Sequence, residues 1–316
     1  MAQRNKRSGR KARGAAARRV RDVSRERVQN ARDQMSRALE TRRKNSRRKK
    51  EAQRLEGLPY LALVHTPRRP ISPRLMGSRL KLASYNVHRW TGLNGRKAPD
   101  PARAGFVISE LDADVIALQE VLRPEGEECP LSAIADVLGM HLTFAVTRQH
   151  RRGQLGNAIL SRFPMTAISV IDISFSRVER RGALAVQFGG EAGNLAVIAT
   201  HLSLVDRTRQ RQVKQLLRHP QLQSGPAVLL GDMNAWRKCK ATQELNDQMD
   251  RHHNRDWPST FPATAPVLAL DRVYAHRAKV LSVRAHDTPS SRRASDHLPV
   301  VARIELPAPT EEPDER

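Results

Sequence analysis

The chain has 316 residues, of which 56 are Lys or Arg and 32 are Asp or Glu, so its formal net charge is +24 at pH 7. Its two cysteines, Cys129 and Cys239, are too few for a disulfide framework and are not spaced as a zinc site. No apolar stretch near the N-terminus has the length of a signal peptide, and the run 58–64 is far too short to span a bilayer. We therefore expect a cytoplasmic protein, with peripheral attachment to a membrane or the nucleoid left open.

The positive charge is concentrated in residues 1–56, which hold 21 of the 56 basic residues and 6 of the 32 acidic ones. The segment from Ser8 to Arg54 has no aromatic residue, so it cannot bury enough apolar surface to offset its ordering entropy. We predict a disordered tail or a solvated helix here, and a disordered acidic tail at residues 307–316. A basic tail is attracted to nucleic acid through counterion release and to anionic membrane lipid through the same Coulomb forces. A merely solubilising extension is the third alternative.

A proline-rich stretch follows the basic tail, with four prolines between Pro59 and Pro73. Proline lacks a backbone N–H and fits neither a helix interior nor a central strand, so the pattern predicts a linker over residues 57–78. The folded domain is then expected to span residues 79–306, which is long enough for one substantial core.

Short apolar runs recur through this domain, and most have the length of a strand. In chain order they are 80–87, 115–118, 158–160, 167–173, 183–188, 195–199, 227–230, 267–274, 280–283 and 298–304. Helical candidates are longer and fewer, namely 101–111, 131–138, 205–218 and 242–251. Several strands follow one another without a helix between them, which disfavours a purely parallel sheet. The pattern favours a mixed two-sheet sandwich with outer helices.

Polar side chains that could carry chemistry stand where these runs end. The clearest example is Gly231-Asp232-Met233-Asn234, directly after the apolar run 227–230. Residues two apart on a strand point to the same face, so Asp232 and Asn234 should converge while Met233 turns toward the core. The other such residues are Asn86, His88, Gln119, Glu120, Thr200, His201, Asp271, Arg272, Ser295, Asp296 and His297. Taken singly, each could serve as an ordinary turn, cap or core residue.

Seven short motifs containing these residues occur in one order along the chain. They are SYNVH (84–88), LQEV (118–121), GNAILSRFP (156–164), THL (200–202), GDMN (231–234), LDRVY (270–274) and SDHLPV (295–300). In this order they resemble the endonuclease/exonuclease/phosphatase family, which includes DNase I, abasic-site endonucleases, neutral sphingomyelinases and inositol polyphosphate 5-phosphatases. The resemblance covers about residues 79–306 and implies a DNase I-like, four-layer α/β/β/α sandwich of two mixed sheets.

The resemblance also implies a metal site and a water-activating residue. Glu120 corresponds to the principal ligand of a divalent metal, helped by Asn86 and Asp296. Mg²⁺ is the expected ion because carboxylate and amide oxygens are hard ligands, and Mn²⁺ could substitute. Asp232 resembles the residue that activates or orients the attacking water, and Asn234 the one that fixes this water or a phosphate oxygen.

Four further residues complete the implied site. Asp271 resembles the partner that orients His297, so that the pair presents an imidazolium to the negative charge developing on phosphorus. His201 and Asn157 resemble residues that contact the scissile phosphate. Whether Asp232 or the dyad of Asp271 and His297 is the general base is left open by the sequence.

Two departures separate the chain from the specialised branches of the family. His88 stands where abasic-site endonucleases carry an acid that can ligate metal, which suggests a different substrate contact. The motif LDRVY lacks the Trp-Cys that precedes the related pattern in the 5-phosphatases. The nearest resemblance is therefore to compact bacterial members known only as metal-dependent hydrolases or endonuclease-like proteins.

Three functions are compatible with these observations. The first is a metal-dependent phosphodiesterase that acts on nucleic acid, supported by the basic tail and by Arg148, Arg151 and Arg152, which could equally form a solvated loop. The second keeps the chemistry but acts on a phospholipid or other phosphoester at an anionic membrane surface. The third is an inactive binding scaffold, which the presence of all the implied ligands disfavours. We expect an endonuclease-like nuclease that works as a monomer.

Overall fold

A computed structural model describes residues 57, 59–70, 76–125, 129–175, 179–190, 193–250 and 256–307. These residues, apart from Gly57, belong to one folded unit that begins at Leu58. The predicted basic tail at residues 1–56, and all but the first residue of the predicted acidic tail at residues 307–316, lie outside the described residues.

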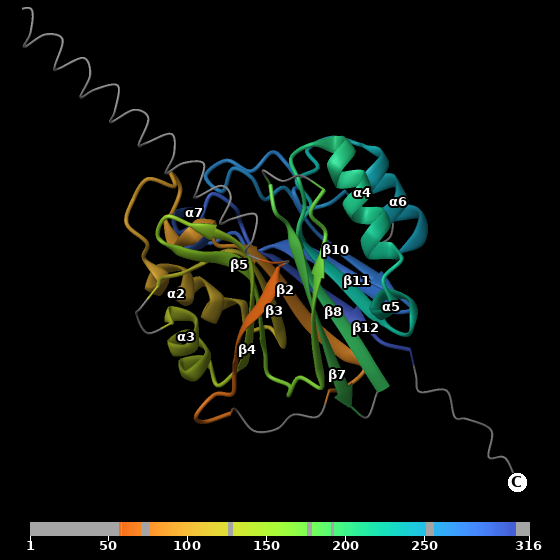
Figure 1. Ribbon diagram of the computed structural model, residues 1–316, viewed down its shortest axis with the longest axis horizontal. Helices are drawn as coiled ribbons and strands as arrows, with labels where there is room; N and C mark the ends of the chain where they lie inside the picture. Colours follow the sequence, from red (N-terminus) through yellow and green to blue (C-terminus); the bar gives the residue numbers. More distant parts are fainter. Residues whose placement is uncertain are drawn as a thin grey trace, which may run out of the picture. The chain divides into compact units, whose positions relative to one another are not determined.

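The described strands form two sheets (Figure 1). The seven-stranded sheet has the order β1-β4-β5-β3-β2-β12-β11, and its strands are β1 Tyr60–His65, β2 Arg79–Asn86, β3 Val115–Arg123, β4 His141–His150, β5 Gly153–Ser161, β11 Lys279–Ala285 and β12 Val300–Glu305. The five-stranded sheet has the order β10-β9-β8-β7-β6, and its strands are β6 Ala167–Asp172, β7 Gly182–Gly190, β8 Gly193–His201, β9 Ala227–Asp232 and β10 Asp271–His276. The pairs β2/β3 and β8/β9 are parallel and the other pairs are antiparallel, so both sheets are mixed, as predicted.

Helices cover the outer faces of the two sheets. They are α2 Pro101–Leu111, α3 Pro130–Leu138, α4 Asp206–Leu217, α5 Pro220–Gln223, α6 Lys240–Gln248 and α7 Ser291–Ala294, with a short 3₁₀ turn, η1, at His88–Trp90. Figure 1 shows α2 and α3 on one side of the sandwich and α4, α5 and α6 on the other. The four helices predicted from the sequence correspond to α2, α3, α4 and α6.

Three hydrophobic clusters hold the four layers together. Because both faces of a central strand are buried, its apolar side chains alternate between two clusters. In β3, Val115 and Ala117 join the cluster between the sheets, while Ile116 and Leu118 join the cluster under α2 and α3. The third cluster lies between the five-stranded sheet and α4, α5 and α6. The predicted four-layer sandwich is confirmed.

The predicted linker at residues 57–78 is wrong for β1, which is an edge strand of the larger sheet. Tyr60–His65 pairs antiparallel with β4, and a register shift falls between Leu61 and Leu63. An edge strand has a sheet partner on one side only, and its prolines flank it at Pro59 and Pro67 instead of interrupting it. The sheet therefore begins earlier in the chain than the proline pattern suggested.

Two further strands differ from the sequence prediction. The strand β4 at His141–His150 was not predicted, because Thr143, Thr147 and Arg148 interrupt its apolar pattern. The run 267–274 becomes a strand only from Asp271 onward. No helix in the described part of the chain is long and apolar enough to cross a membrane.

Candidate active site

Three strand positions of the five-stranded sheet meet at Asp232, the last residue of β9. His201 of β8 and Asp271 of β10 are its direct neighbours in the sheet register, one on either side. Gly231 makes this close pairing possible, because its φ is +148° and a Cβ there would lie 1.9 Å from the carbonyl oxygen of Thr200. The acid of the GDMN motif therefore stands in the middle of a row of three predicted site residues.

The seven-stranded sheet reaches the same carboxylate through Asn86, the last residue of β2. Asn86 donates from Nδ2 to Oδ2 of Asp232 at 3.1 Å, and its Oδ1 accepts from the backbone N–H of His88 at 3.0 Å. The hydroxyl of Ser295 donates to the carbonyl oxygen of Asn86 at 2.6 Å and accepts from the backbone N–H of His297 at 3.3 Å. The site thus spans both sheets and the loop before β12.

The carboxylate of Asp232 is only 1% exposed but has several polar partners. Its Oδ1 accepts from the backbone N–H of Asn234 at 2.8 Å, and its Oδ2 lies 3.4 Å from Nε2 of His201 and 3.7 Å from Nε2 of His297. Burial raises the pKa of Asp232 to about 6, which the imidazolium of His297 opposes and the nearby Asp271 reinforces. The carboxyl is therefore mostly ionised at pH 7, in the range that suits a general base.

His297 is held by a carboxylate on its other nitrogen. Its Nδ1 lies 2.8 Å from Oδ2 of Asp271, and the hydroxyl of Thr260 donates to the same oxygen at 2.6 Å. Burial works against a charged ring, but the charges of Asp271 and Asp232 outweigh it and raise the pKa of His297 to about 10. The structure brings the predicted dyad together, and its imidazole is an imidazolium at neutral pH.

His201 is buried in the same cluster, yet it takes the opposite charge state. Burial lowers its pKa well below the ordinary value, and the positive charges of Arg181, His297 and Arg148 lower it further. His201 is therefore neutral at pH 7 and can donate or accept a hydrogen bond without adding charge. The two histidines beside Asp232 therefore differ in charge because their electrostatic surroundings differ.

Asn234 lies against Asp232, but its side chain is turned toward the loop after β8. Its backbone has a φ of +50°, and its Nδ2 donates to the carbonyl oxygen of Leu202 at 2.9 Å. Met233 is buried in the cluster under α4 and α6, as the strand alternation predicted. The contacts of Asn234 fix the orientation of the Asp232 carboxylate, and its predicted contact with water or phosphate stays a prediction.

Arg209 of α4 was missed by the sequence reasoning, although it joins two loops of the site. Its side chain is fully buried, and its Nη1 donates at 2.7 Å to the carbonyl oxygens of both Ser203 and Asn234. Its guanidinium also pairs with Asp206. The loop after β8 and the loop after β9 are thereby tied to one charged group.

A signal for this arginine was present in the sequence. Arg209 precedes Val213 by four residues and Leu216 by seven, so it stands on the apolar stripe of the predicted helix 205–218. A charged residue on a buried stripe needs partners, and here backbone carbonyls supply them.

Glu120, the predicted principal metal ligand, sits at a kink of β3. Its φ is +51°, and the pairing of β3 with β5 shifts register between Leu118 and Val121. The kink gives this residue a backbone direction that a regular strand would not allow. Nε of Arg89 lies 3.4 Å from Oε2 of Glu120.

Asp296, the second predicted acidic ligand, lies near Glu120. Burial raises the pKa of Asp296, and the negative charge of Glu120 adds to that increase while His297 and His88 oppose it. Nδ1 of His88 lies 3.2 Å from Oδ1 of Asp296. The carboxylates of Glu120 and Asp296 and the amide oxygen of Asn86 are hard oxygen donors, the kind of ligand that suits Mg²⁺ or Mn²⁺. These residues fit the metal that the sequence predicted.

A second set of side chains could also hold a metal ion. Ligand atoms of Asp232, Asp271 and His297 all lie within 4.8 Å of one another, and all three residues are buried. An imidazolium has no free lone pair for a metal, and Oδ2 of Asp271 already accepts two hydrogen bonds. The chemistry of this set suits acid and base groups, and the metal site at Glu120 stays a prediction.

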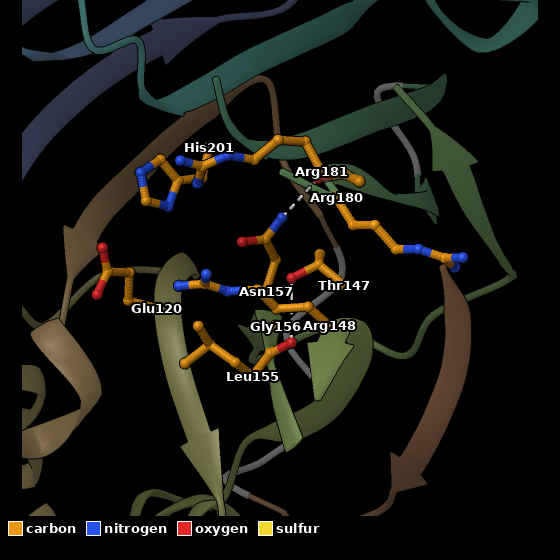
Figure 2. A pocket seen from close by; sticks show the side chains of 10 residues that line it. Glu120, Thr147, Arg148, Leu155, Gly156, Asn157, Arg180, Arg181 and His201 are labelled. Atoms are coloured by element: carbon orange, nitrogen blue, oxygen red, sulfur yellow. Dashed lines mark hydrogen bonds between the residues drawn. The ribbon is translucent and has the colours of Figure 1, made fainter. Parts of the chain in front are cut away.

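Asn157 lies in a small pocket beside the Asp232 cluster. The pocket is lined by Glu120, Thr147, Arg148, Leu155, Gly156, Asn157, Arg180, Arg181, Gly182 and His201. Figure 2 shows Asn157 pointing into it, with Glu120 and His201 on the facing side. Nδ2 of Asn157 donates to the carbonyl oxygen of Gly182 at 2.8 Å, so the side chain is fixed before any substrate arrives.

The arginines predicted to support nucleic-acid binding separate in the structure. Arg148 lines the pocket, Arg151 is exposed in the turn after β4, and Nη1 of Arg152 donates to the carbonyl oxygen of Lys97 at 3.1 Å. Only Arg148 of the three lines this pocket.

The sequence pattern of the endonuclease/exonuclease/phosphatase family matches residues 83–297, which include both ends of the site described above. The chain belongs to the endonuclease/exonuclease/phosphatase family. The uncharacterized protein YbhP of Escherichia coli strain K12 is 30% identical over 256 residues, covering 72% of this chain and 96% of YbhP.

Two solved structures show the same fold as this family member. An endonuclease/exonuclease/phosphatase from Beutenbergia cavernae has a TM-score of 0.58 and 22% identity, covering 73% of this chain and 72% of its own. The human Nocturnin catalytic domain, solved with a bound sulfate anion, has a TM-score of 0.58 and 20% identity, covering 79% of this chain and 97% of its own. The family assignment supports phosphoester hydrolysis as the class of reaction.

Proposed function

We propose that this protein is a divalent-metal-dependent phosphodiesterase that acts on nucleic acid as an endonuclease-like nuclease. The observation that carries the proposal is the environment of Asp232. An ionised carboxylate lies between a neutral histidine, His201, and an imidazolium, His297. This arrangement supplies a base, a neutral hydrogen-bonding group and a positive charge at one point.

Asp232 is the base in this proposal. Its carboxylate is oriented by the backbone N–H of Asn234 and by Nδ2 of Asn86, and its pKa of about 6 leaves it able to accept the proton of an attacking water at neutral pH. His297 cannot act as the base at this pH, because it already carries its proton. Its Nε2–H instead faces the negative charge that develops on the phosphoryl oxygens.

Glu120, Asn86 and Asp296 would hold the metal. When bound there, a Mg²⁺ ion would polarise the phosphoryl oxygen and stabilise the leaving oxygen. Asn157 and His201 border the substrate pocket from β5 and β8, and their positions suit hydrogen bonds to the scissile phosphate.

Nucleic acid is the proposed substrate because the protein carries a large positive charge. The formal net charge is +24, and 21 basic residues lie in residues 1–56. Phosphate neutralisation by Lys and Arg supplies most of the affinity in sequence-independent binding. The tail is proposed to hold the polyanion, and the family domain is proposed to cleave it.

Plasmid nicking tests this function directly. Supercoiled DNA with Mg²⁺ should be relaxed by the wild-type protein and by Asp247→Asn, a matched change at an exposed acid of α6, but not by Asp232→Asn. EDTA should abolish the wild-type activity. Nicking that persists unchanged in Asp232→Asn would show that another group is the base or that a contaminant cleaves the plasmid.

An alternative substrate is a phospholipid at an anionic membrane surface. One observation favours it: Leu204 and Val205, in the loop after β8, are 55% and 57% exposed, and Trp236, in the loop after β9, is 45% exposed. Apolar side chains on loops that follow site residues could enter a lipid interface. Hydrolysis of phospholipid vesicles, run beside the plasmid assay with the same variants, separates the two substrates.

A binding scaffold without catalysis is the remaining alternative. Activity on neither DNA nor phospholipid, combined with the absence of Mg²⁺ or Mn²⁺ binding that depends on Glu120, would support it.

A further inference from the structure

The short turn η1, at His88–Trp90, has a backbone conformation that residues with a side chain rarely adopt. All three of its residues have a positive φ, at +44°, +58° and +63°. Such a conformation is unfavourable for each residue, so it persists only where the surrounding structure enforces it, and it is concentrated at functional sites. The turn therefore needs an account of what holds it and of what its side chains face.

Contacts on two sides hold the turn in place. Trp90 is buried, and its Nε1 donates at 2.7 Å to the carbonyl oxygen of Leu122 in β3. On the other side, Gly95 has a φ of +62°, and a Cβ there would lie 3.0 Å from both Nη2 of Arg89 and Nε2 of His88. The directions of the side chains of His88 and Arg89 are therefore set by the packing around the turn.

The turn presents two consecutive side chains to the two acidic residues that are predicted to bind the metal. Nδ1 of His88 lies 3.2 Å from Oδ1 of Asp296, and Nε of Arg89 lies 3.4 Å from Oε2 of Glu120. Nδ1 of His88 also lies 2.8 Å from the carbonyl oxygen of Gly92, which can only accept, so this nitrogen carries a proton. Each predicted acidic ligand thus has an N–H group close to its carboxylate.

The pair of Arg89 and Glu120 is close, but it is not a strong ion pair. Nε of Arg89 is buried and has no hydrogen-bond partner among the described residues. The two side chains are 28% and 21% exposed, so solvent screens their attraction. An ion pair of this kind contributes little stability, and a divalent cation that binds Oε2 of Glu120 would displace the guanidinium.

Glu120 also supplies counter-charge to a second arginine, Arg148, which extends toward it in Figure 2. Burial lowers the pKa of Arg148, and the positive charges of Arg181 and Arg89 lower it further, while Glu120 opposes them. A metal bound to Glu120 would take this counter-charge away from both Arg89 and Arg148. A phosphate in the pocket that Arg148 and Glu120 line would replace it.

We propose that Arg89 couples metal binding to phosphate binding: it competes with the metal for Glu120, and the substrate phosphate pairs with the guanidinium that the metal releases. The inference rests on the proposed phosphodiesterase function and gives Arg89 a part in it. Metal and phosphate then bind cooperatively, because each removes a cost that the other would otherwise meet.

Calorimetric titration with Mn²⁺ and thymidine 5′-monophosphate tests this coupling without turnover. In the absence of the nucleotide, Arg89→Met should bind Mn²⁺ about threefold more tightly than wild type, because the competing cation is gone. The nucleotide should tighten Mn²⁺ binding at least about fivefold more in wild type than in Arg89→Met. Arg151→Met, which removes the same charge from the exposed turn after β4, should behave as wild type.

The sign of the change separates competition from a structural role. If Arg89 only supported the turn, its loss would misplace Glu120 and weaken Mn²⁺ binding, so equal or weaker binding in Arg89→Met overturns the proposal. Equal tightening by the nucleotide in wild type and Arg89→Met also overturns it. Arg89→Gln keeps a polar side chain without the charge, and it decides the question if Arg89→Met does not fold.

A double-mutant cycle locates the competition at one carboxylate. The effect of Arg89→Met on Mn²⁺ affinity should disappear in the Glu120→Gln background, because there is no longer a charge for which two cations compete. An effect of the same size in both backgrounds would overturn the proposed competition at Glu120.

The plasmid assay keeps the failure of this coupling distinct from the failure of the proposed function. Loss of the coupling in the titrations, with Mg²⁺-dependent nicking by wild type intact, overturns the role of Arg89 alone. Coupling in the titrations without any nicking overturns the nuclease function and supports the role of Arg89 toward metal and phosphate.

Discussion

Nε2 of His297 lies 3.7 Å from Oδ2 of Asp232, and each group sets the charge of the other. The carboxylate raises the pKa of the imidazole, and the imidazolium limits the rise that burial causes in the pKa of Asp232. At neutral pH the pair is therefore ionised on both sides, with the negative member able to accept a proton and the positive member able to face a growing negative charge.

Removing either member should affect the rate far more than the fold. We expect Asp232→Asn and His297→Ala each to lower kcat at least about a hundredfold, because both groups act on the transition state. Steady-state kinetics on a soluble phosphodiester, with urea unfolding of the same samples, measures the two effects separately. A rate within about tenfold of wild type in either variant would show that its role is misassigned.

The rate should depend on pH through both members of the pair. Asp232 must be ionised, so kcat/KM should fall as the pH drops through about 6. His297 must be protonated, so the rate should also fall as the pH rises through about 10. A pH profile of kcat/KM at saturating metal checks both limbs, which belong to the coupled pair. A rate that rises steadily from pH 6 to pH 10 would contradict the protonation states inferred here.

Metal binding should depend on Glu120. We expect Glu120→Gln to weaken Mg²⁺ or Mn²⁺ binding by at least about tenfold, because the change removes a formal charge from a set of hard oxygen ligands. Calorimetric titration with Mn²⁺ measures this without reference to turnover. Asp271→Asn serves as the comparison, since Asp271 belongs to the other cluster that could hold a metal. A larger loss in Asp271→Asn than in Glu120→Gln would move the metal to the cluster of Asp232, Asp271 and His297.

Arg209 should matter for both stability and catalysis. Arg209→Met leaves two carbonyl oxygens without their buried donor and removes one of the two arginines that pair with Asp206, so we expect a loss of about 3 kcal/mol in the free energy of unfolding. The loops after β8 and β9 should also loosen, which would lower kcat more than it raises KM. Urea unfolding and kinetics on a soluble phosphodiester measure these effects. Arg207→Met, at an exposed position of the same helix, is the control. Equal behaviour of the two variants would show that Arg209 does not hold the two loops together.

Deleting residues 1–56 should separate binding from chemistry. Turnover of a small soluble phosphodiester should be unchanged, whereas affinity for a polyanion should fall and depend less steeply on salt, because fewer counterions are released. Fluorescence binding to single-stranded and double-stranded oligonucleotides at several salt concentrations measures the slope. A slope identical to that of the full chain would exclude the tail from substrate binding.

The fold was largely readable from the sequence because most central strands are apolar on both faces. In runs such as 115–118 and 227–230 every side chain is buried, so the sequence shows a continuous apolar run that predicts a central strand. The edge strand β1 and its partner β4 were missed for two different reasons. Prolines on either side of β1 resemble a linker when no partner strand is visible, and Thr143, Thr147 and Arg148 interrupt the apolar pattern of β4.

The residues of the site could be predicted from the sequence, but their charge states could not. The motifs indicated Asp232, His297 and Asp271 as site residues, and the order of the motifs identified the family. No sequence pattern shows that His201 is neutral while His297 is charged, because that difference arises from burial and from arginines brought close by folding. Arg209 was missed because one of the carbonyl groups that it binds, that of Asn234, lies in a loop that the sequence does not place beside it.

The hydrogen bond from Asn86 to Asp232 joins residues of different sheets, so the chemistry rests on how the two layers of the sandwich are aligned. The apolar side chains between the layers set that alignment. A small shift of one sheet relative to the other would break the hydrogen bond between Asn86 and Asp232 while every strand stayed intact. Substitutions between the layers are therefore expected to misalign the site before they disrupt a strand.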